Sequence, residues 1–387
     1  MNSERFILLW LQAGLVWFFV AMATSPTNKL YQQGLVLLFW LPALIAAFTF
    51  RKEFRTTVRE RWVVFLMMGA LLLWVACSLG WSDVENPAQR AKRLLYVVLF
   101  CVGMGALALR GEKTLERLLL GLSTIMAALA LWHIYQYYIV SDTSWTSRLH
   151  PNTQIGHPIL GGYVMGVCAV IVISALENAP KRLTICATAA IIALISFMAL
   201  TQSRGVMLAL ILTVVLFPIA KPSKAGYAAA ATLIATALLG YFFLEPFITS
   251  RGFSYRPEIA LESLRMIFES PIAGVGLSGE YVVTPPEYPG KSFVHSHNLF
   301  LHVGIESGLP ALILLATIWL CMGRDAWRYR HSGLGSTLLA VWTYATVAVM
   351  FDVASFWDPP RSTWMVTWFP IGLWIATMVS RHQQTAS

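Results

Sequence analysis

The segment "WVVFLMMGALLLWVACSLG", residues 62–80, contains no charged side chain. A helix rises 1.5 Å per residue, so this segment is long enough to cross the roughly 30 Å hydrocarbon core of a membrane. The whole chain of 387 residues has the same character, because 57% of its residues are hydrophobic and only 12% are charged. Soluble globular domains are about 25% charged, so this composition predicts an integral membrane protein.

Similar apolar runs recur along the sequence and predict an all-α fold with about twelve transmembrane helices in one polytopic domain, residues 1–387. The first run has no signal-peptide cleavage site and is expected to remain as a span. The five cysteines lie singly in apolar runs, which indicates packing. The spans are expected near residues 5–24, 30–50, 62–80, 92–110, 114–140, 157–176, 183–200, 204–220, 226–247, 297–320, 334–354 and 364–380.

The loop "RKEFRTTVRERW", residues 51–62, carries five basic residues and sets the expected orientation. Positively charged loops stay in the cytoplasm, so we expect both termini there and the longest connections, residues 141–156 and 248–296, on the outer side. Most of the 28 Lys and Arg residues then fall in cytoplasmic loops. The outer basic residues run against this rule, which indicates an anionic ligand at that surface or, alternatively, contacts with lipid phosphates.

The outer connection 248–296 is expected to carry a surface helix and a flap over the site. In "RPEIALESLRMIFESP", Pro257 suits a first helical position, and Ala260, Leu264 and Ile267 fall on one face. This pattern predicts an amphipathic helix on the membrane surface. The segment that follows, residues 271–292, is rich in Gly and Pro and is expected to be irregular.

Three polar motifs converge on the outer side of the predicted membrane domain. Ser203, Arg204 and Gly205 open the eighth expected span. Arg256 precedes the surface helix, which ends in "SPIAGVG". His297 and Asn298 open the tenth expected span within "HSHNLFLHVGIESGLP". Titratable groups at these positions are hard to explain by membrane insertion alone and indicate a functional site.

This set of motifs resembles the O-antigen ligase and Wzy-type polymerase superfamily of bacterial envelope proteins. The similarity rests on the Ser-Arg-Gly turn, the Pro-x-x-Gly-x-Gly segment that begins at Pro271, and the His-Asn-x-x-Leu motif that ends at Leu301. The aromatic residue that often follows the second arginine in the family is absent here. The second phosphate ligand could therefore be Arg251 or Arg256, and Arg256 is preferred.

The resemblance implies a glycosyltransferase of the bacterial inner membrane with its active site on the periplasmic side. In this family a glycan is transferred from undecaprenyl diphosphate to an acceptor, which in ligases is the lipid A–core oligosaccharide. The expected partners are therefore undecaprenyl diphosphate-linked O-antigen, lipid A–core and membrane lipids, with no nucleic acid and no cofactor. O-antigen polymerase and protein O-oligosaccharyltransferase share these motifs and remain alternatives.

The same residues indicate how the reaction would proceed. His297 is a candidate general base for the acceptor hydroxyl, and nearby arginines are expected to favour its neutral form. Arg204 and Arg256 are candidate ligands of the lipid diphosphate, because a guanidinium binds phosphate oxygens in pairs. The expected substrate-binding shell comprises Arg90, Arg93, Arg148, Arg251, Arg265, His295 and Asn298.

Two further features bear on the mechanism. Asn298, His302 and Glu306 recur at four-residue spacing, so we expect a polar stripe locked against neighbouring spans rather than a partner for His297. Asp83 and Glu85 form the one acidic pair expected on the outer side. Because the arginines can neutralise the diphosphate, we expect no metal and an inverting single displacement.

A secondary transporter is the alternative from another class, since twelve spans are common among carriers. Carriers show matching halves and helices broken at mid-membrane, whereas the membrane charges here gather at one face. The sequence therefore favours an enzyme.

Overall fold

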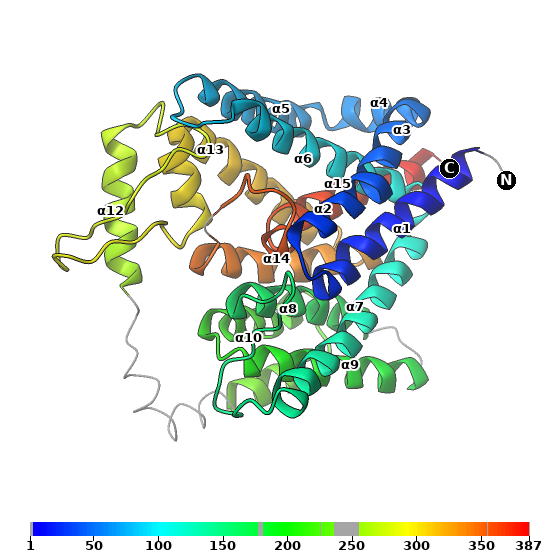
Figure 1. Cartoon of the computed structure of the whole chain (residues 1–387). Helices are drawn as coiled ribbons and strands as arrows, with labels where there is room; N and C mark the ends of the chain where they lie inside the picture. Colours follow the sequence, from blue (N-terminus) through cyan, green and yellow to red (C-terminus); the bar gives the residue numbers. More distant parts are fainter. Residues whose placement is uncertain (1–2, 177–180, 225, 236–254, 354, 387) are drawn as a thin grey trace.

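The computed structural model describes residues 3–176, 181–224, 226–235, 255–353 and 355–386 and is almost entirely helical (Figure 1). In this part of the chain, ten helical segments are long and apolar enough to cross a membrane. Two shorter apolar helices, Arg204–Ala220 and Gly226–Ala235, lie where the eighth and ninth spans were expected. The all-α membrane fold is confirmed, although the ninth expected span lies partly outside the described residues.

The helices have bounds close to those expected from the apolar runs. A π-helical turn, Val36–Trp40, joins α2 and α3 into one span, and another, Tyr135–Val140, extends α7. The helices are α1 Ser3–Thr24, α2 Asn28–Leu35, α3 Leu41–Thr49, α4 Arg51–Glu60, α5 Trp62–Cys77, α6 Pro87–Ala108, α7 Glu112–Ile134, α8 Pro158–Ala175, α9 Lys181–Leu200, α10 Arg204–Ala220, α12 Arg256–Glu269, α13 Leu299–Arg328, α14 Gly333–Phe351 and α15 Trp368–Ala386.

The connections between spans gather at two opposite ends of the molecule. Figure 1 shows both termini at one end, while α12 runs across the span ends at the other. At the terminal end, Arg61 lies 3.8 Å from Asp325, and Glu112 accepts a hydrogen bond from the backbone of Leu334. Contacts among the connections at one end of the molecule are expected when successive spans alternate in direction.

Burial divides the helices into a central group and a peripheral group. The span that contains α15 is entirely buried, whereas only 22% of the α5 span is buried. Peripheral helices carry exposed apolar side chains such as Phe48 and Ile185. In a membrane these side chains contact lipid chains, so their exposure is compatible with a stable fold.

Helix α13 is interrupted at Gly308, where φ is 73° and ψ is −179°. Pro310 follows two residues later, and a proline removes a helical backbone donor. The connecting loop supplies partners for the freed backbone groups. The carbonyls of Ile305 and Glu306 accept hydrogen bonds from the amides of Val275 (2.9 Å) and Gly276 (2.7 Å), and Leu309 N donates to the carbonyl of Pro271 (2.7 Å). Trp74 Nε1 donates to the carbonyl of Ser307 (2.8 Å).

The segment 271–276 was expected to lie above the spans, but it docks into the break of α13. Gly274 and Gly276 both have positive φ, at 60° and 86°, which disfavours other residue types. A side chain at Gly276 would also meet Ser82, since a Cβ there would lie 2.6 Å from the Ser82 Cβ. The glycines of the Pro-x-x-Gly-x-Gly motif are thus required by close packing.

Helix α12 forms as predicted but buries a different face. Its buried residues are Ile259, Ser263 and Ile267, whereas Leu264, expected on the same apolar face as Ile267, is exposed. The reason is its packing on α13, where Gly304 leaves room for Ile267. The exposed face carries Leu261, Leu264 and Phe268, which leaves an apolar surface on the outside of the helix.

Candidate active site

Three helix ends bring His297, Asp352 and Arg256 together at the end of the molecule opposite the termini. His297 Nδ1 lies 3.2 Å from Asp352 Oδ1, and Arg256 Nη2 donates to Asp352 Oδ2 at 2.7 Å. Arg256 Nε also donates to the carbonyl of Phe351 at 3.0 Å. Asp352 is buried, with 6% of its side chain exposed, whereas the side chains of His297 and Arg256 are 28% and 30% exposed. The Asp352 carboxylate therefore contacts both His297 and Arg256, whose side chains are partly accessible.

Local backbone geometry fixes each member of this cluster. Asn298 caps α13 by accepting hydrogen bonds from the amides of Phe300 and Leu301, and its side-chain nitrogen lies 3.3 Å from the carbonyl of Met350 at the end of α14. His297, directly before this cap, has a φ of 53°. Positive φ is uncommon outside glycine and costs conformational energy. The surrounding contacts thus hold His297 in a strained position beside Asp352, which follows α14.

The hydrogen bond to Asp352 defines which nitrogen of His297 carries a hydrogen. An ionised carboxylate only accepts hydrogen bonds, so Nδ1 is the donor. In a neutral imidazole the other nitrogen, Nε2, then has a free lone pair and can accept a proton. The expectation that nearby arginines favour the neutral form of His297 stays a prediction, and the structure adds a direct contact with the Asp352 carboxylate.

The Ser-Arg-Gly turn lies against the same carboxylate. A Cβ on Gly205 would lie 3.7 Å from Asp352 Oδ2 and 2.9 Å from the hydroxyl oxygen of Tyr163. Arg204, one residue earlier, is the first residue of α10, and its side chain is exposed. Gly205 thus permits the close approach of the Ser-Arg-Gly turn to Asp352, and Arg204 is its neighbour in the sequence.

Arg148 belongs to a loop that supports the Ser-Arg-Gly turn. Its Nε donates to the carbonyl of Thr201 at 2.9 Å, and Gln202 Nε2 donates to the carbonyl of Thr146 at 2.8 Å. Burial lowers the pKa of the nearby His157, with Arg148 acting in the same direction and Asp352 opposing both. His157 therefore favours its neutral form beside the cluster, although no sequence motif singled it out.

His295 lies directly beside His297, with ring centroids 4.2 Å apart in an edge-to-face arrangement. Burial lowers the pKa of His295, and the neighbouring His297 lowers it further. A neutral His295 packs against His297 without adding a second positive charge.

A second basic group lies at the start of α6. Arg93 Nη1 lies 3.8 Å from Asp358 Oδ1, and Arg361 contacts the same carboxylate. Arg90, one turn before Arg93, is close enough to interact with it electrostatically. Sequence reasoning did not select Asp358 or Arg361, which lie in the connection between α14 and α15.

One of the expected substrate-binding residues, Arg265, is not brought to the cluster. Arg265 lies on the outer face of α12, with 63% of its side chain exposed, 3.5 Å from Glu262. Arg251 lies outside the described residues, so the choice between Arg251 and Arg256 rests on the contacts of Arg256 alone.

The expected polar stripe of α13 forms a second histidine–carboxylate pair. His302 Nε2 lies 3.3 Å from Glu306 Oε2, and both side chains are buried. Tyr281 hydrogen-bonds His302 Nδ1 (2.7 Å), and Ser278 N donates to Glu306 (3.0 Å). The stripe is therefore locked mainly against the loop after α12 rather than against neighbouring spans.

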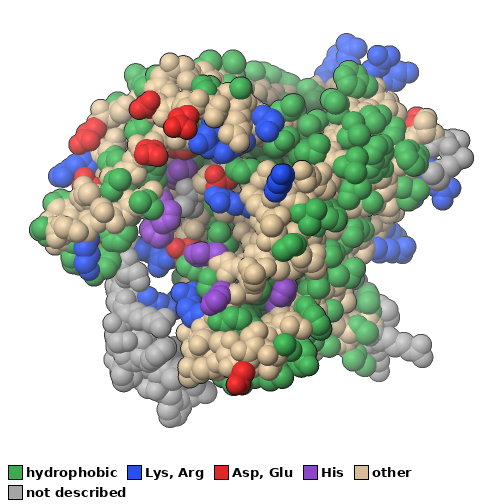
Figure 2. Space-filling view, viewed as in Figure 1, with side chains coloured by type: hydrophobic (Ala, Val, Ile, Leu, Met, Phe, Trp, Pro, Cys, Tyr) green, Lys and Arg blue, Asp and Glu red, His purple; other side chains and the backbone are tan. Residues whose placement is uncertain are grey.

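Acidic residues do not assemble into a metal-binding group in the described part of the chain. Asp83 and Glu85 are both exposed, in the connection between α5 and α6. Figure 2 shows instead that histidine and basic side chains gather around a hollow on the face shown, between the α12–α13 and α8–α10 parts of the molecule. The described site is thus suited to binding anions.

Sequence reasoning missed Asp352, which links the two motifs. It stands 55 residues after His297 and 96 residues after Arg256. A lone acidic residue at the outer end of an apolar run was the available signal, since such residues are rare near membranes.

The fold and the cluster define a multi-pass membrane protein with a histidine–aspartate–arginine site at one end of its helices. Residues 189–316, which include Arg204, Arg256 and His297, match the family model described as O-antigen ligase. The chain is also 26% identical over 325 residues to the O-antigen ligase of Pseudomonas aeruginosa strain PAO1, a match that covers 82% of this chain and 79% of that protein. Both comparisons confirm the resemblance found in the motifs, and they make this chain similar to O-antigen ligases over most of its length.

Proposed function

We propose that this protein transfers O-antigen polysaccharide from undecaprenyl diphosphate to the lipid A–core oligosaccharide on the periplasmic face of the inner membrane. The family match supports O-antigen ligase activity and lipopolysaccharide as the product class. The observation that carries the mechanism is the contact of one buried carboxylate, Asp352, with both His297 and Arg256. This contact joins a candidate base to a candidate phosphate ligand.

His297 would activate the acceptor. Its Nε2 takes the proton of the acceptor hydroxyl while the hydroxyl oxygen attacks the anomeric carbon of the donor sugar. The bond from that carbon to the diphosphate oxygen breaks as the new glycosidic bond forms, which inverts the configuration. Asp352 keeps Nδ1–H oriented and stabilises the imidazolium that results.

Arg204 and Arg256 would stabilise the leaving group. Negative charge grows on the diphosphate as its bond to the sugar breaks, and a preorganised guanidinium stabilises this charge without reorganisation. Arg256 carries five N–H donors, of which the contacts to Phe351 and Asp352 use two. Arginines can replace a metal in this role, so we propose a metal-independent reaction.

The other expected ligands take supporting positions in this proposal. Arg90 and Arg93 lie at the start of α6, where they would bind anionic groups of the substrates. Arg148 would hold the Ser-Arg-Gly turn, and Asn298 would hold the start of α13. In this proposal residues 1–387 form one membrane domain. Its connection 248–296 faces the periplasm and covers the site.

Reconstitution tests the proposed function. Purified protein is mixed with a lipid-linked O-antigen donor and rough lipopolysaccharide, and a ladder of longer lipopolysaccharide is expected on gels, also with excess chelator. Extension of the lipid-linked glycan without added lipopolysaccharide would identify a polymerase instead. Loss of the ladder with chelator, reversed by magnesium or manganese, would contradict the metal-independent mechanism.

A further inference from the structure

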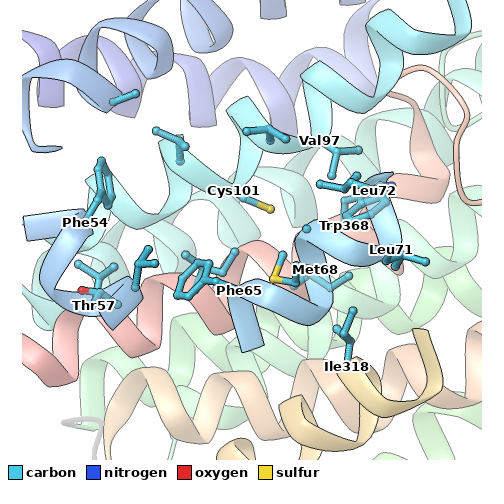
Figure 3. A pocket seen from close by; sticks show the side chains of 18 of the residues that line it. Phe54, Thr57, Phe65, Met68, Leu71, Leu72, Val97, Cys101, Ile318 and Trp368 are labelled. Carbon is cyan, nitrogen blue, oxygen red and sulfur yellow. The ribbon is translucent and has the colours of Figure 1, made fainter. Parts of the chain in front are cut away.

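The membrane-embedded part of the protein contains a cavity of about 380 Å³ that shares no lining residue with the candidate active site. Helices α5, α6 and α15 form most of its wall, and α3, α4 and α13 complete it. Figure 3 shows the side chains of Phe65, Met68, Val97 and Trp368 around this space. The wall is almost entirely hydrocarbon, so its occupant must be apolar.

The cavity exists because two helix pairs diverge. Helix α5 packs along α13, whereas α6 packs along α15, and α5 and α6 touch each other only slightly. Gly69 of α5 faces the gap, and a Cβ added there would meet no atom within 4 Å. An unfilled gap of this size forfeits the dispersion contacts of its lining. A lipid chain from the surrounding membrane would restore these contacts.

The length of the cavity matches one membrane leaflet. Its α15 wall extends from Trp368 to Val379, which corresponds to about 17 Å of helix at 1.5 Å per residue. This is roughly half of the 30 Å hydrocarbon core. One end is lined by Phe54 and Thr57 of α4, which lies on the side of the molecule where both termini are found (Figure 1). The cavity therefore belongs to the leaflet opposite the candidate active site.

Helix α4 places positive charge at the mouth of this cavity. Its face with Phe54, Thr57 and Val58 lines the cavity. The rest of the helix carries two acidic residues, Glu53 and Glu60, the latter paired with His382 at 2.9 Å. Exposed basic residues outnumber these acids on the same helix: Arg51, Lys52, Arg55 and Arg59. A net positive helix at a membrane surface attracts anionic headgroups.

We propose that an anionic glycerophospholipid of the cytoplasmic leaflet binds here, with one acyl chain in the cavity and its phosphate on the basic residues of α4. The inference uses the orientation proposed above but not the transferase activity. The chain of the lipid-linked donor is a less suitable occupant, because the cavity lining ends at residues such as Leu72 and Val97 and includes no member of the site that would bind the diphosphate.

Lipid retention measured by native mass spectrometry tests this site. The protein is exchanged into mixtures of phosphatidylglycerol and phosphatidylcholine with identical acyl chains. We expect phosphatidylglycerol to be retained about fivefold or more over phosphatidylcholine, a preference that one or two favourable charge contacts can supply. Equal retention of the two lipids would overturn the proposal.

Matched variants separate the acyl and headgroup contacts. Gly69→Leu fills the cavity and should abolish retention, whereas Gly121→Leu should not. Gly121 is also a helical glycine with open space around it, but it does not line this cavity. The double variant Arg51→Gln with Arg55→Gln should remove the preference for phosphatidylglycerol. Unchanged retention in Gly69→Leu would overturn the assignment.

Photo-crosslinking of the unmodified protein keeps the proposal testable if Gly69→Leu does not fold. A phosphatidylglycerol with a diazirine in its acyl chain should label peptides that contain residues 65–72 and 97–102. Labelling that is absent from these peptides, or that is displaced by undecaprenyl phosphate but not by phosphatidylglycerol, would refute an anionic glycerophospholipid as the occupant.

Discussion

Two histidine–carboxylate pairs lie five residues apart at the start of α13, and their surroundings differ. His297 pairs with Asp352 from another helix, keeps 28% of its side chain exposed, and shares its carboxylate with Arg256. His302 pairs with Glu306 on the same helix, is 8% exposed, and is covered by Tyr281. A proton-transfer group must be reached by substrate, so the same chemical pair can act in catalysis at one position and in packing at the other.

The largest effect on transfer is expected at the accessible pair. His297→Ala should lower the transfer rate by roughly 10²- to 10⁴-fold, the usual contribution of a general base, while donor binding persists. Donor affinity and single-turnover transfer in nanodiscs measure the two quantities separately. If His297→Ala retains wild-type turnover while His295→Ala loses it, the base has been assigned to the wrong histidine.

Arg256→Ala should follow, with a loss of about 10²- to 10³-fold in transfer together with weaker donor binding, because the diphosphate is contacted before and during the reaction. Lysine should rescue poorly, since it lacks the guanidinium fork. Arg204→Ala should cause a similar loss of transfer and of donor binding. Arg265→Ala is the matched control on the exposed face of α12, and an equal loss there would argue against a specific phosphate ligand.

Asp352→Asn should lower transfer less, by about 10- to 100-fold, as with other hydrogen-bond partners that orient a functional histidine. The amide keeps an acceptor but loses the charge that stabilises the imidazolium. Donor binding should change little, which distinguishes this positioning role from that of Arg256. A matching loss of donor affinity would show that Asp352 acts chiefly by holding Arg256.

The buried pair should affect stability and leave the transfer rate of the folded protein unchanged. His302→Leu or Glu306→Leu alone leaves a buried polar partner and should cost about 3–5 kcal/mol, whereas the double variant should recover much of this loss. Thermal unfolding in detergent measures the stability. Folded His302→Leu that binds donor but cannot transfer would place His302 in the chemistry.

The smallest effect concerns pH. Burial lowers the pKa of His157 and His295 in the folded protein. As the pH falls below about 6.5, the ordinary histidine value, the unfolded state takes up protons first, so stability should decrease. His157→Gln or His295→Gln should flatten the loss of stability between about pH 7 and 5. A steeper loss in either variant would contradict the assigned direction.

The membrane fold was predictable because a helix that crosses the hydrocarbon core satisfies its own backbone hydrogen bonds. Such a helix also needs a long run of apolar side chains, which can be read from the sequence. The structure also brings the three motifs together, with His297, Arg256 and Gly205 all close to Asp352. Asp352 escaped prediction because its role depends on how the end of α14 meets two distant helix starts. Leu264 and Ile267 were expected on one apolar face, but only Ile267 is buried, because hydrophobic spacing does not reveal that Gly304 of α13 accommodates it.

The break of α13 has a consequence for how the protein assembles. A carbonyl without a partner costs several kcal/mol in hydrocarbon, and those of Ile305 and Glu306 depend on amides of residues 275–276. In the proposed orientation, this loop is synthesised before α13 and crosses the membrane ahead of it. Insertion of α13 is complete only after the loop has folded back, so both form in one cooperative step. His297 lies between them in the chain, so in this orientation its placement beside Asp352 would depend on the same step.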